Sequence, residues 1–231
     1  MPEKLSRVMA IMPHPDDAEF GAAGTIARWV KEGKEATYVV CTNGDKGSSD
    51  PDMTSERLAI IRRREQTEAA RVLGVKEVVF LDYPDGWLED TPDFRGKLVR
   101  LIRKYQPDIV MTTDPYRKYM WHRDHRITGV VALDAIFPYA RDRLSYPEHI
   151  AEGLPTHHVR EIYLWGAEDP DTYVDVTNTF ELKIAALTCH TSQIGARIET
   201  LRERIRERCE KVGQSHGCSL AETFRRIVIP Y

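Results

Sequence analysis

The sequence predicts an α/β fold in which a mostly parallel, Rossmann-like sheet carries helices on both faces. Short β-rich runs alternate with helical stretches along the chain, which is typical of such a sheet. Clusters of histidine and aspartate follow two of the apolar runs, one directly and one after a loop, at the edge where open parallel sheets build their sites. No repeat or linker interrupts the pattern, so residues 1–231 are expected to form a single domain.

In the first half of the chain, apolar and β-branched runs predict strands, and apolar residues at helical spacing predict helices. The helix that precedes Gly74 is well delimited, because glycine commonly follows the last turn of a helix. Pro107 marks the turn before the fourth strand. The expected strands are 7–12, 36–41, 77–81 and 109–112, and the expected helices are about 25–31, 55–73 and 94–105.

The second half continues the alternation with shorter strands. A helix over 126–140 is expected because its apolar residues fall on one side. The other expected elements are strands at 161–165 and 172–176 and helices at 180–188 and 196–211. The last helix is rich in Glu and Arg, which indicates a solvated face with i,i+4 ion pairs rather than a binding surface.

The composition is that of a globular protein, with 42% apolar and 30% charged residues. A formal net charge of −3 gives no attraction to nucleic acid or to an anionic membrane, so neither is expected as a partner. No apolar run could span a bilayer, and the first apolar stretch is too short for a signal peptide. The four cysteines are scattered without a CxxC pair and are expected to be free thiols in a cytoplasmic protein.

The segment PHPDDAEFG, residues 13–21, places a histidine and three acids between a predicted strand and a predicted helix. Adjacent carboxylates repel one another, so Asp16 and Asp17 favour either protonation of one of them or binding of a cation. His14 and Asp17 offer a nitrogen and an oxygen within one turn, which suits zinc, and the flanking prolines stiffen the loop. The alternative interpretation is a helix cap in which Asp16 or Asp17 accepts hydrogen bonds from the first turn.

The segment WHRDH, residues 121–125, follows the fourth predicted strand and supplies two more histidines. His122 and His125 are three residues apart and can share one face at the start of a helix. A zinc ion held by His14, Asp17 and one of these histidines has three protein ligands and one position left for water, as in catalytic zinc sites. The other histidine is then available for acid–base chemistry.

Four segments in this order, PHPDDAEFGAAGT, CTNGDKG, RRREQTEAARVLG and HRDH, resemble the LmbE-like (PIG-L) family of zinc-dependent N-deacetylases. That family includes deacetylases of phosphatidylinositol-linked N-acetylglucosamine, of bacillithiol and mycothiol precursors, and of diacetylchitobiose. The resemblance extends from the first strand to the HTSQ segment at 190–193. HPDD with a distal HxDH is its specific part, whereas TNGDKG alone is a weak signal.

The resemblance implies a role for each residue that matches the motifs. His14, Asp17 and His125 are implied as ligands of Zn2+, although another divalent transition metal could occupy the same site. Asp16 is implied as the general base, and a protonated His122 as the residue beside the developing oxyanion. The chain would therefore hydrolyse the N-acetyl group of an amino sugar or sugar conjugate, releasing acetate and a free amine.

The resemblance also implies supporting residues. Asp124 either orients His122 or caps the following helix. Arg62 matches an arginine that the family uses near the substrate, with the register among Arg62, Arg63 and Arg64 left open. Arg123 replaces a proline that is common in relatives, which leaves the stiffness of this loop open.

The substrate contacts are less well defined by the sequence. Tyr119 and Trp121 lie just before His122, where aromatic rings could stack on a sugar, fill a core or form a subunit interface. Residues 83–87 form either a substrate contact or a turn, and His190 is either structural or close to the site. A homo-oligomer is expected, because relatives often assemble.

Two other functions are compatible with the same residues. A zinc-dependent hydratase of an unsaturated carboxylate could use the same metal and aspartate. A catalytically silent sugar-binding protein could retain the fold, but such a protein has no need of a base beside an open metal position.

Overall fold

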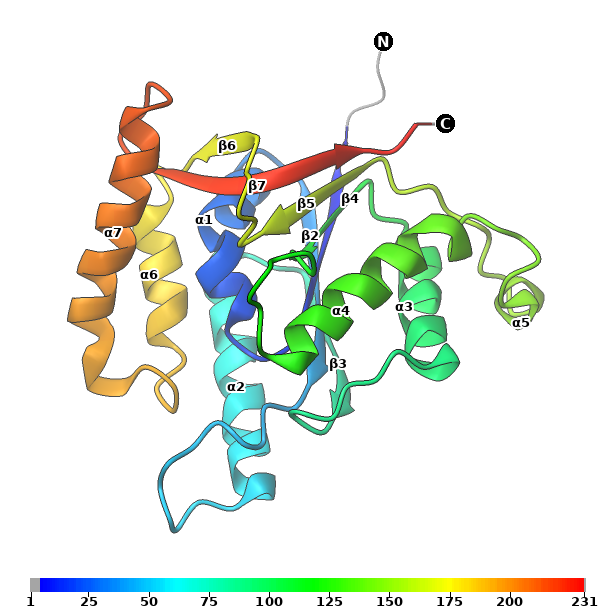
Figure 1. The fold of residues 1–231 in the computed structure, drawn as a ribbon, viewed down its shortest axis with the longest axis horizontal. Helices are drawn as coiled ribbons and strands as arrows, with labels where there is room; N and C mark the ends of the chain where they lie inside the picture. Colours follow the sequence, from blue (N-terminus) through cyan, green and yellow to red (C-terminus); the bar gives the residue numbers. More distant parts are fainter. Residues whose placement is uncertain (1–4, 231) are drawn as a thin grey trace.

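The computed structural model describes residues 5–230, which form a seven-stranded sheet between two layers of helices (Figure 1). The strand order is β3-β2-β1-β4-β5-β7-β6. Neighbouring strands from β3 to β5 pair in parallel, whereas β7 pairs antiparallel with both β5 and β6. The predicted fold class is therefore confirmed. The strands are β1 (Arg7–Met12), β2 (Glu35–Thr42), β3 (Glu77–Tyr83), β4 (Ile109–Thr113), β5 (Glu161–Trp165), β6 (Thr172–Asp175) and β7 (Ala221–Val228).

The helices cover both faces of the sheet. On one face α1 and α2 cover the strands and α6 packs on both of these helices, and on the other face α3 and α4 cover the strands (Figure 1). α7 lies against the outer side of α6. The helices are α1 (Asp17–Lys31), α2 (Ser55–Leu73), α3 (Pro92–Tyr105), α4 (Arg123–Asp134), α5 (Pro147–Ala151), α6 (Phe180–Thr188) and α7 (Ile198–Gln214). Within residues 5–230, none of them has the length and apolar character needed to cross a bilayer.

The two central strands, β1 and β4, position the site. Both are buried along almost their whole length, which explains their continuous apolar sequences. The chain adds β2 and β3 on one side of β1 within the sheet and then returns to place β4 on the other side of β1. Open α/β sheets form a crevice at such a reversal of strand order, outside the carboxyl ends of the strands.

The start of α1 differs from the prediction. The helix begins at Asp17 rather than near Thr25. The prediction started it too late because Gly21 and Gly24 lower the helical propensity of the first turns, which packing nevertheless makes helical. A Cβ atom on Gly21 would lie 2.5 Å from the Trp165 ring, so this glycine lets α1 approach the sheet. α1 therefore starts directly at the site.

Three other elements differ from the prediction. α4 begins at Arg123 instead of residue 126 and ends at Asp134; the following Ala135–Tyr139 segment is kinked at Phe137, whose φ of −145° and ψ of 121° are not helical. The short helix α5 and the strand β7 have no counterpart in the prediction. The outer half of β7 is exposed and carries two arginines, so its sequence lacks the apolar run of a buried strand.

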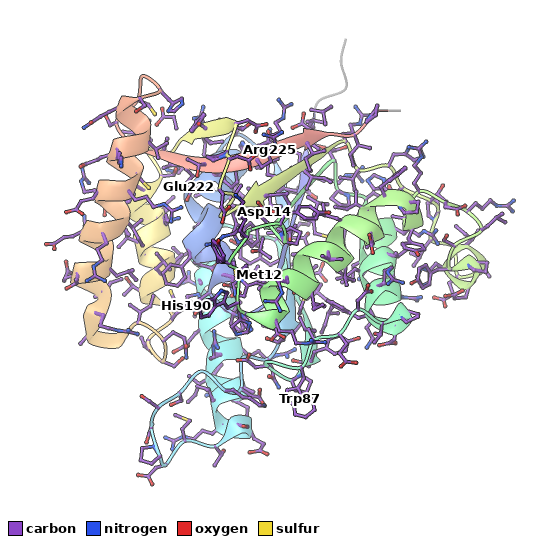
Figure 2. All side chains as sticks on the ribbon, viewed as in Figure 1. Met12, Trp87, Asp114, His190, Glu222 and Arg225 are labelled. Atoms are coloured by element: carbon purple, nitrogen blue, oxygen red, sulfur yellow. The ribbon has the colours of Figure 1, made fainter. Side chains whose placement is uncertain are left out.

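Glu222 of β7 joins three elements through a buried network near the top of the view in Figure 2. Its Oε1 lies 2.7 Å from Nζ of Lys183 in α6 and accepts from the Gly24 N–H. Its Oε2 accepts from the backbone N–H and the hydroxyl of Thr25 at 2.8 and 2.6 Å. Both charged side chains are 3% exposed, so each depends on the other for compensation.

We expect Glu222→Gln to lower the free energy of unfolding by about 3–5 kcal/mol, because the ammonium of Lys183 is left buried without its counter-charge. Denaturant titration at constant slope measures this loss. The double variant Lys183→Met/Glu222→Gln leaves no unpaired charge and should recover part of it. A single variant that loses less than about 1 kcal/mol would contradict the importance of this ion pair.

Candidate active site

The two histidine–aspartate motifs meet at the carboxyl ends of β1 and β4. The PHPDD loop follows Met12, the last residue of β1, which Figure 2 labels near the centre of the molecule. The HRDH motif opens α4 after β4. The ring centroid of His14 lies 4.6 Å from that of His122 and 5.2 Å from that of His125. Segments far apart in the sequence thus form one cluster.

His14 is buried among three carboxylates. Its Nδ1 lies 3.1 Å from Oδ2 of Asp17, and its Nε2 lies 3.1 Å from both Oδ1 of Asp85 and Oδ2 of Asp124. Burial lowers the pKa of His14, but the hydrogen bonds to Asp124, Asp17 and Asp85 outweigh it and raise the pKa to about 11. The surroundings of His14 therefore favour a positive charge, either a proton or a metal cation.

Asp17 connects His14 to the second motif. Its Oδ1 lies 3.4 Å from Nε2 of His125. Burial raises the pKa of Asp17, but His125 and His14 outweigh it and lower the pKa to about 2. Burial also lowers the pKa of His125. An ionised carboxylate and a neutral imidazole are the forms that bind metal ions.

The described residues contain two overlapping groups that could hold a metal ion. One consists of His14, His122 and His125, and the other of His14, Asp85, His122 and Asp124, with the donor atoms of each group within 4.8 Å of one another. Imidazole nitrogens together with carboxylate oxygens suit zinc and other divalent transition metals. The site therefore has the donor chemistry that a divalent metal requires.

Asp85 belongs to the 83–87 segment, for which the sequence predicted either a substrate contact or a turn but no contact with His14. It follows β3 and is 7% exposed, with its carboxylate on His14. Its position after a third parallel strand was the available signal, because the carboxyl ends of β3, β1 and β4 lie at one edge of the sheet. His14 holds the pKa of Asp85 below its usual range, against the effect of burial.

Asp16 lies beside the metal cluster and is the N-cap residue of α1, with an unusual φ of 106°. Its side chain makes no capping hydrogen bond, so the helix-cap interpretation is wrong for Asp16. Instead, its Oδ2 accepts from Nη2 of Arg62 at 3.2 Å. Burial and the charge of Asp17 raise the pKa of Asp16 to about 7, although Arg62 acts in the opposite direction. A carboxyl group with this pKa suits proton transfer near neutral pH.

His122 is the N-cap residue of α4, and its Nδ1 accepts from the Asp124 backbone N–H at 3.3 Å. This contact fixes the orientation of the His122 ring. The carboxylate of Asp124 accepts from the backbone N–H groups of Gly86 and Leu88 at 2.6 and 3.1 Å. It therefore ties the loop after β3 to the site, in addition to contacting His14.

Arg62 is the member of the arginine triplet that reaches the site. It is 4% exposed, and its guanidinium donates to the carbonyl oxygens of Pro15 and Gly44. A Cβ atom on Gly44 would lie 2.5 Å from Nη1 of Arg62, which explains the first glycine of the TNGDKG segment. Arg63 pairs with Asp82 at the surface.

The aromatic residues near the site are among the most exposed large side chains. Trp121 is 84% and Tyr119 is 79% exposed, both on the loop that leads into α4. Trp87, 71% exposed, lies on the loop after β3 and points away from the sheet in Figure 2. These rings are therefore not part of the core, which excludes one of the three interpretations of Tyr119 and Trp121.

Two cavities flank the cluster. One of 260 Å3 lies beside Asp17 and His125 and includes Trp165 and Arg117 in its lining. The other, of 400 Å3, lies beside Asp16 and is lined by residues of α7 and of the segment before it. Phe20 contributes to both. Space for a ligand thus exists on either side of the two aspartates.

The HTSQ segment contacts α1 and α2. His190 is fully buried, and its Nε2 lies 3.5 Å from Oε2 of Glu19. The carboxylate of Glu65 accepts from the hydroxyl of Thr191 and from the backbone N–H and the hydroxyl of Ser192. These contacts attach the segment after α6 to α2.

Comparison with known proteins identifies relatives that are de-N-acetylases. The family model described as PIG-L, GlcNAc-PI de-N-acetylase, matches residues 9–136. Diacetylchitobiose deacetylase of Thermococcus kodakarensis is 33% identical over 189 residues, covering 82% of this chain and 70% of that protein. A probable N-acetyl-alpha-D-glucosaminyl L-malate deacetylase 2 of Bacillus anthracis is 29% identical and covers 84% of each chain.

Two solved structures have the same fold as this chain. N,N'-diacetylchitobiose deacetylase from Pyrococcus horikoshii has a TM-score of 0.91 and 34% sequence identity, covering 96% of this chain and 84% of that one. The 4-carboxy-2-hydroxymuconate hydratase from Pseudomonas putida has a TM-score of 0.83 over 98% of both chains, and its 22% identity shows the shared fold alone. The family match, the identity and the positions of the motifs lead to one conclusion: this chain belongs to the PIG-L family of de-N-acetylases.

Proposed function

We propose that the protein is a zinc-dependent hydrolase that removes the acetyl group from the nitrogen of an amino sugar or amino-sugar conjugate. The observation that carries the proposal is the meeting of PHPDD and HRDH in one buried histidine–aspartate cluster beside two cavities. The names of the relatives support it, because they act on diacetylchitobiose and on N-acetylglucosaminyl malate. The products are acetate and a free amine.

We assign His14, Asp17 and His125 to the metal, in line with the family resemblance. Asp17 faces both histidines, at 3.1 and 3.4 Å, so these three side chains would hold the ion together. When bound, zinc supplies the Lewis acidity that polarises the acetyl carbonyl and lowers the pKa of water to about 7. Asp85 and Asp124 hold the other ring nitrogen of His14, as carboxylates commonly do for histidine ligands.

Asp16 acts as the general base in this proposal. It accepts a proton from the water that attacks the acetyl carbon, while Arg62 holds its carboxylate in place. The protonated Asp16 then delivers the proton to the departing nitrogen. We assign Arg62 to this positioning role instead of a direct substrate contact, because both of its terminal nitrogens donate to protein oxygens.

His122 stabilises the oxyanion of the tetrahedral intermediate through its Nε2–H. The Asp124 backbone N–H, 3.3 Å from Nδ1, orients the His122 ring for this role. Asp124 acts indirectly, by holding the loop after β3 and His14. We propose that Trp121 and Tyr119 stack on the sugar, since both rings are exposed beside His122.

Direct detection of acetate tests the proposal. The purified protein, loaded with zinc, is expected to release acetate and a primary amine from N-acetylglucosamine, diacetylchitobiose or N-acetylglucosaminyl malate. A chelator should abolish the release, and added zinc should restore it. Hydration of an unsaturated dicarboxylate without acetate release would favour a hydratase, and sugar binding without turnover would favour a silent binding protein.

We also propose that the protein acts in the cytoplasm as a homo-oligomer. All four cysteines lie within the described residues as free thiols, which suits a reducing compartment. Light scattering of the purified protein tests the oligomeric state, and a monomer at micromolar concentration would exclude the oligomer.

A further inference from the structure

One peptide unit at the site is held at both ends by a single helix. The carbonyl oxygen of Pro15 accepts from Nη2 of Arg62 at 2.5 Å, and the N–H of Asp16 donates to Oε1 of Gln66 at 2.8 Å. These two groups belong to the same peptide bond. Arg62 and Gln66 are four residues apart in α2, so their side chains lie on the same face one turn apart. Together they define the orientation of the peptide plane that precedes the Asp16 side chain.

The conformation of Asp16 requires such support. Its φ of 106° and ψ of −23° place a residue other than glycine outside the favourable regions of backbone conformation. Conformations of this kind cost about 1–3 kcal/mol and persist only where the surroundings hold them. On the far side of the residue, the Asp16 carbonyl oxygen accepts from the Phe20 N–H at 3.1 Å. Gln66 supplies the hydrogen bond on the near side.

The amide group of Gln66 is itself oriented by a buried carboxylate. Its Nε2 donates to Oε1 of Glu19 at 3.0 Å, and both side chains are fully buried. Because Glu19 takes the amide N–H, the amide oxygen is left facing the Asp16 N–H. His190 lies next in the chain of contacts, 3.5 Å from Glu19 and beside α2 in Figure 2. A buried polar chain thus leads from α6 through α1 and α2 to the backbone of Asp16.

We propose that Gln66 is a positioning residue for the deacetylation reaction, acting through the backbone of Asp16. The inference rests on the proposed role of Asp16 as the general base. Gln66 lines neither cavity, and its side-chain hydrogen bonds go to the Asp16 N–H and to Glu19, so it acts on the reaction through the position of the Asp16 carboxylate. Small displacements of a reacting group are sufficient to slow catalysis by up to about 100-fold.

Replacing Gln66 with methionine tests this role, because methionine has a similar length but no hydrogen-bonding amide. Gln66→Met is expected to lower kcat by about 10- to 100-fold, with KM and zinc content within about twofold of the wild type. If this variant does not fold, Gln66→Asn withdraws the amide by one methylene and should lower kcat in the same way. An unchanged kcat, or a parallel loss of zinc, would overturn the proposal.

A double-variant cycle separates positioning from general damage to the fold. In an Asp16→Asn background, adding Gln66→Met should lower the residual turnover by less than about twofold, because the group that Gln66 positions no longer accepts a proton. Equal losses in both backgrounds would overturn the proposal. Full activity of Asp16→Asn alone would instead remove the proposed role of Asp16, so the two failures are distinguishable.

Glu65 provides the matched control from the neighbouring position of α2. It is also buried, and it binds the 191–192 segment without contacting Asp16. Glu65→Met is expected to lower Tm at least as much as Gln66→Met while leaving kcat within about twofold. A loss of kcat as large as that of Gln66→Met would mean that any buried polar loss in α2 slows the reaction, which would overturn the specific role of Gln66.

Discussion

Replacing Asp16 with asparagine is expected to lower kcat by about 1,000-fold while zinc remains bound at the wild-type level. Asparagine keeps the shape of the side chain and an oxygen that can accept from Arg62, but it does not take up a proton near neutral pH. Asp16 faces Arg62 rather than the histidines, so the proposed metal ligands stay complete. Acetate release and metal analysis of the same preparation measure both quantities.

Asp82 offers a matched control for this substitution. It also has a positive φ, of 56°, but it lies at the surface and pairs with Arg63. Asp82→Asn should leave both zinc and turnover unchanged. Near-normal turnover of Asp16→Asn with zinc retained would remove Asp16 from the mechanism, whereas loss of zinc would make Asp16 a metal ligand.

Replacing His125 with alanine is expected to remove the bound zinc and, with it, at least about 1,000-fold of the activity. The Nε2 of His125 faces Asp17 at 3.4 Å, and alanine offers no donor in its place. Metal analysis after dialysis, together with acetate release at saturating zinc, measures the effect. An unchanged metal stoichiometry would contradict the assignment of His125.

His122→Ala and His125→Ala together distinguish the possible sets of metal donors, because both variants lose zinc if His14, His122 and His125 hold the ion. If His14, Asp17 and His125 bind the ion, His122→Ala keeps its zinc and loses about 100- to 1,000-fold in kcat, as expected for removal of an oxyanion donor. If the ion instead sits among His14, Asp85, His122 and Asp124, the same variant loses zinc, and His125→Ala keeps it. The two variants therefore give a different pattern for each arrangement.

The parts of the fold that sequence predicted well are those decided by local patterns. The continuous apolar runs of β1 and β4 identify buried parallel strands, and Gly74, with a φ of 76°, ends α2 as expected. The meeting of His14 with His122 and His125 follows from the same logic, because neighbouring parallel strands bring their carboxyl ends to one edge.

The parts that sequence did not predict depend on contacts between distant segments. Close packing against Trp165 makes the glycine-containing start of α1 helical, which propensity alone disfavours. The sequence placed the 83–87 segment at the edge of the site, but only the structure shows that the Asp85 carboxylate reaches His14 from the end of β3, two strands away from β1. Gln66 reads as an ordinary residue of an amphipathic helix, and only the three-dimensional arrangement places it on the Asp16 peptide.

The insertion of β7 between β5 and β6 has a consequence for biosynthesis. The nascent chain completes both neighbouring strands before residues 221–228 leave the ribosome, so the gap between them stays open until β7 is available. Until then β5 and β6 present unpaired edges, which can pair with other chains. Closure of the sheet therefore follows the synthesis of β7, and β7 also delivers the carboxylate that neutralises Lys183.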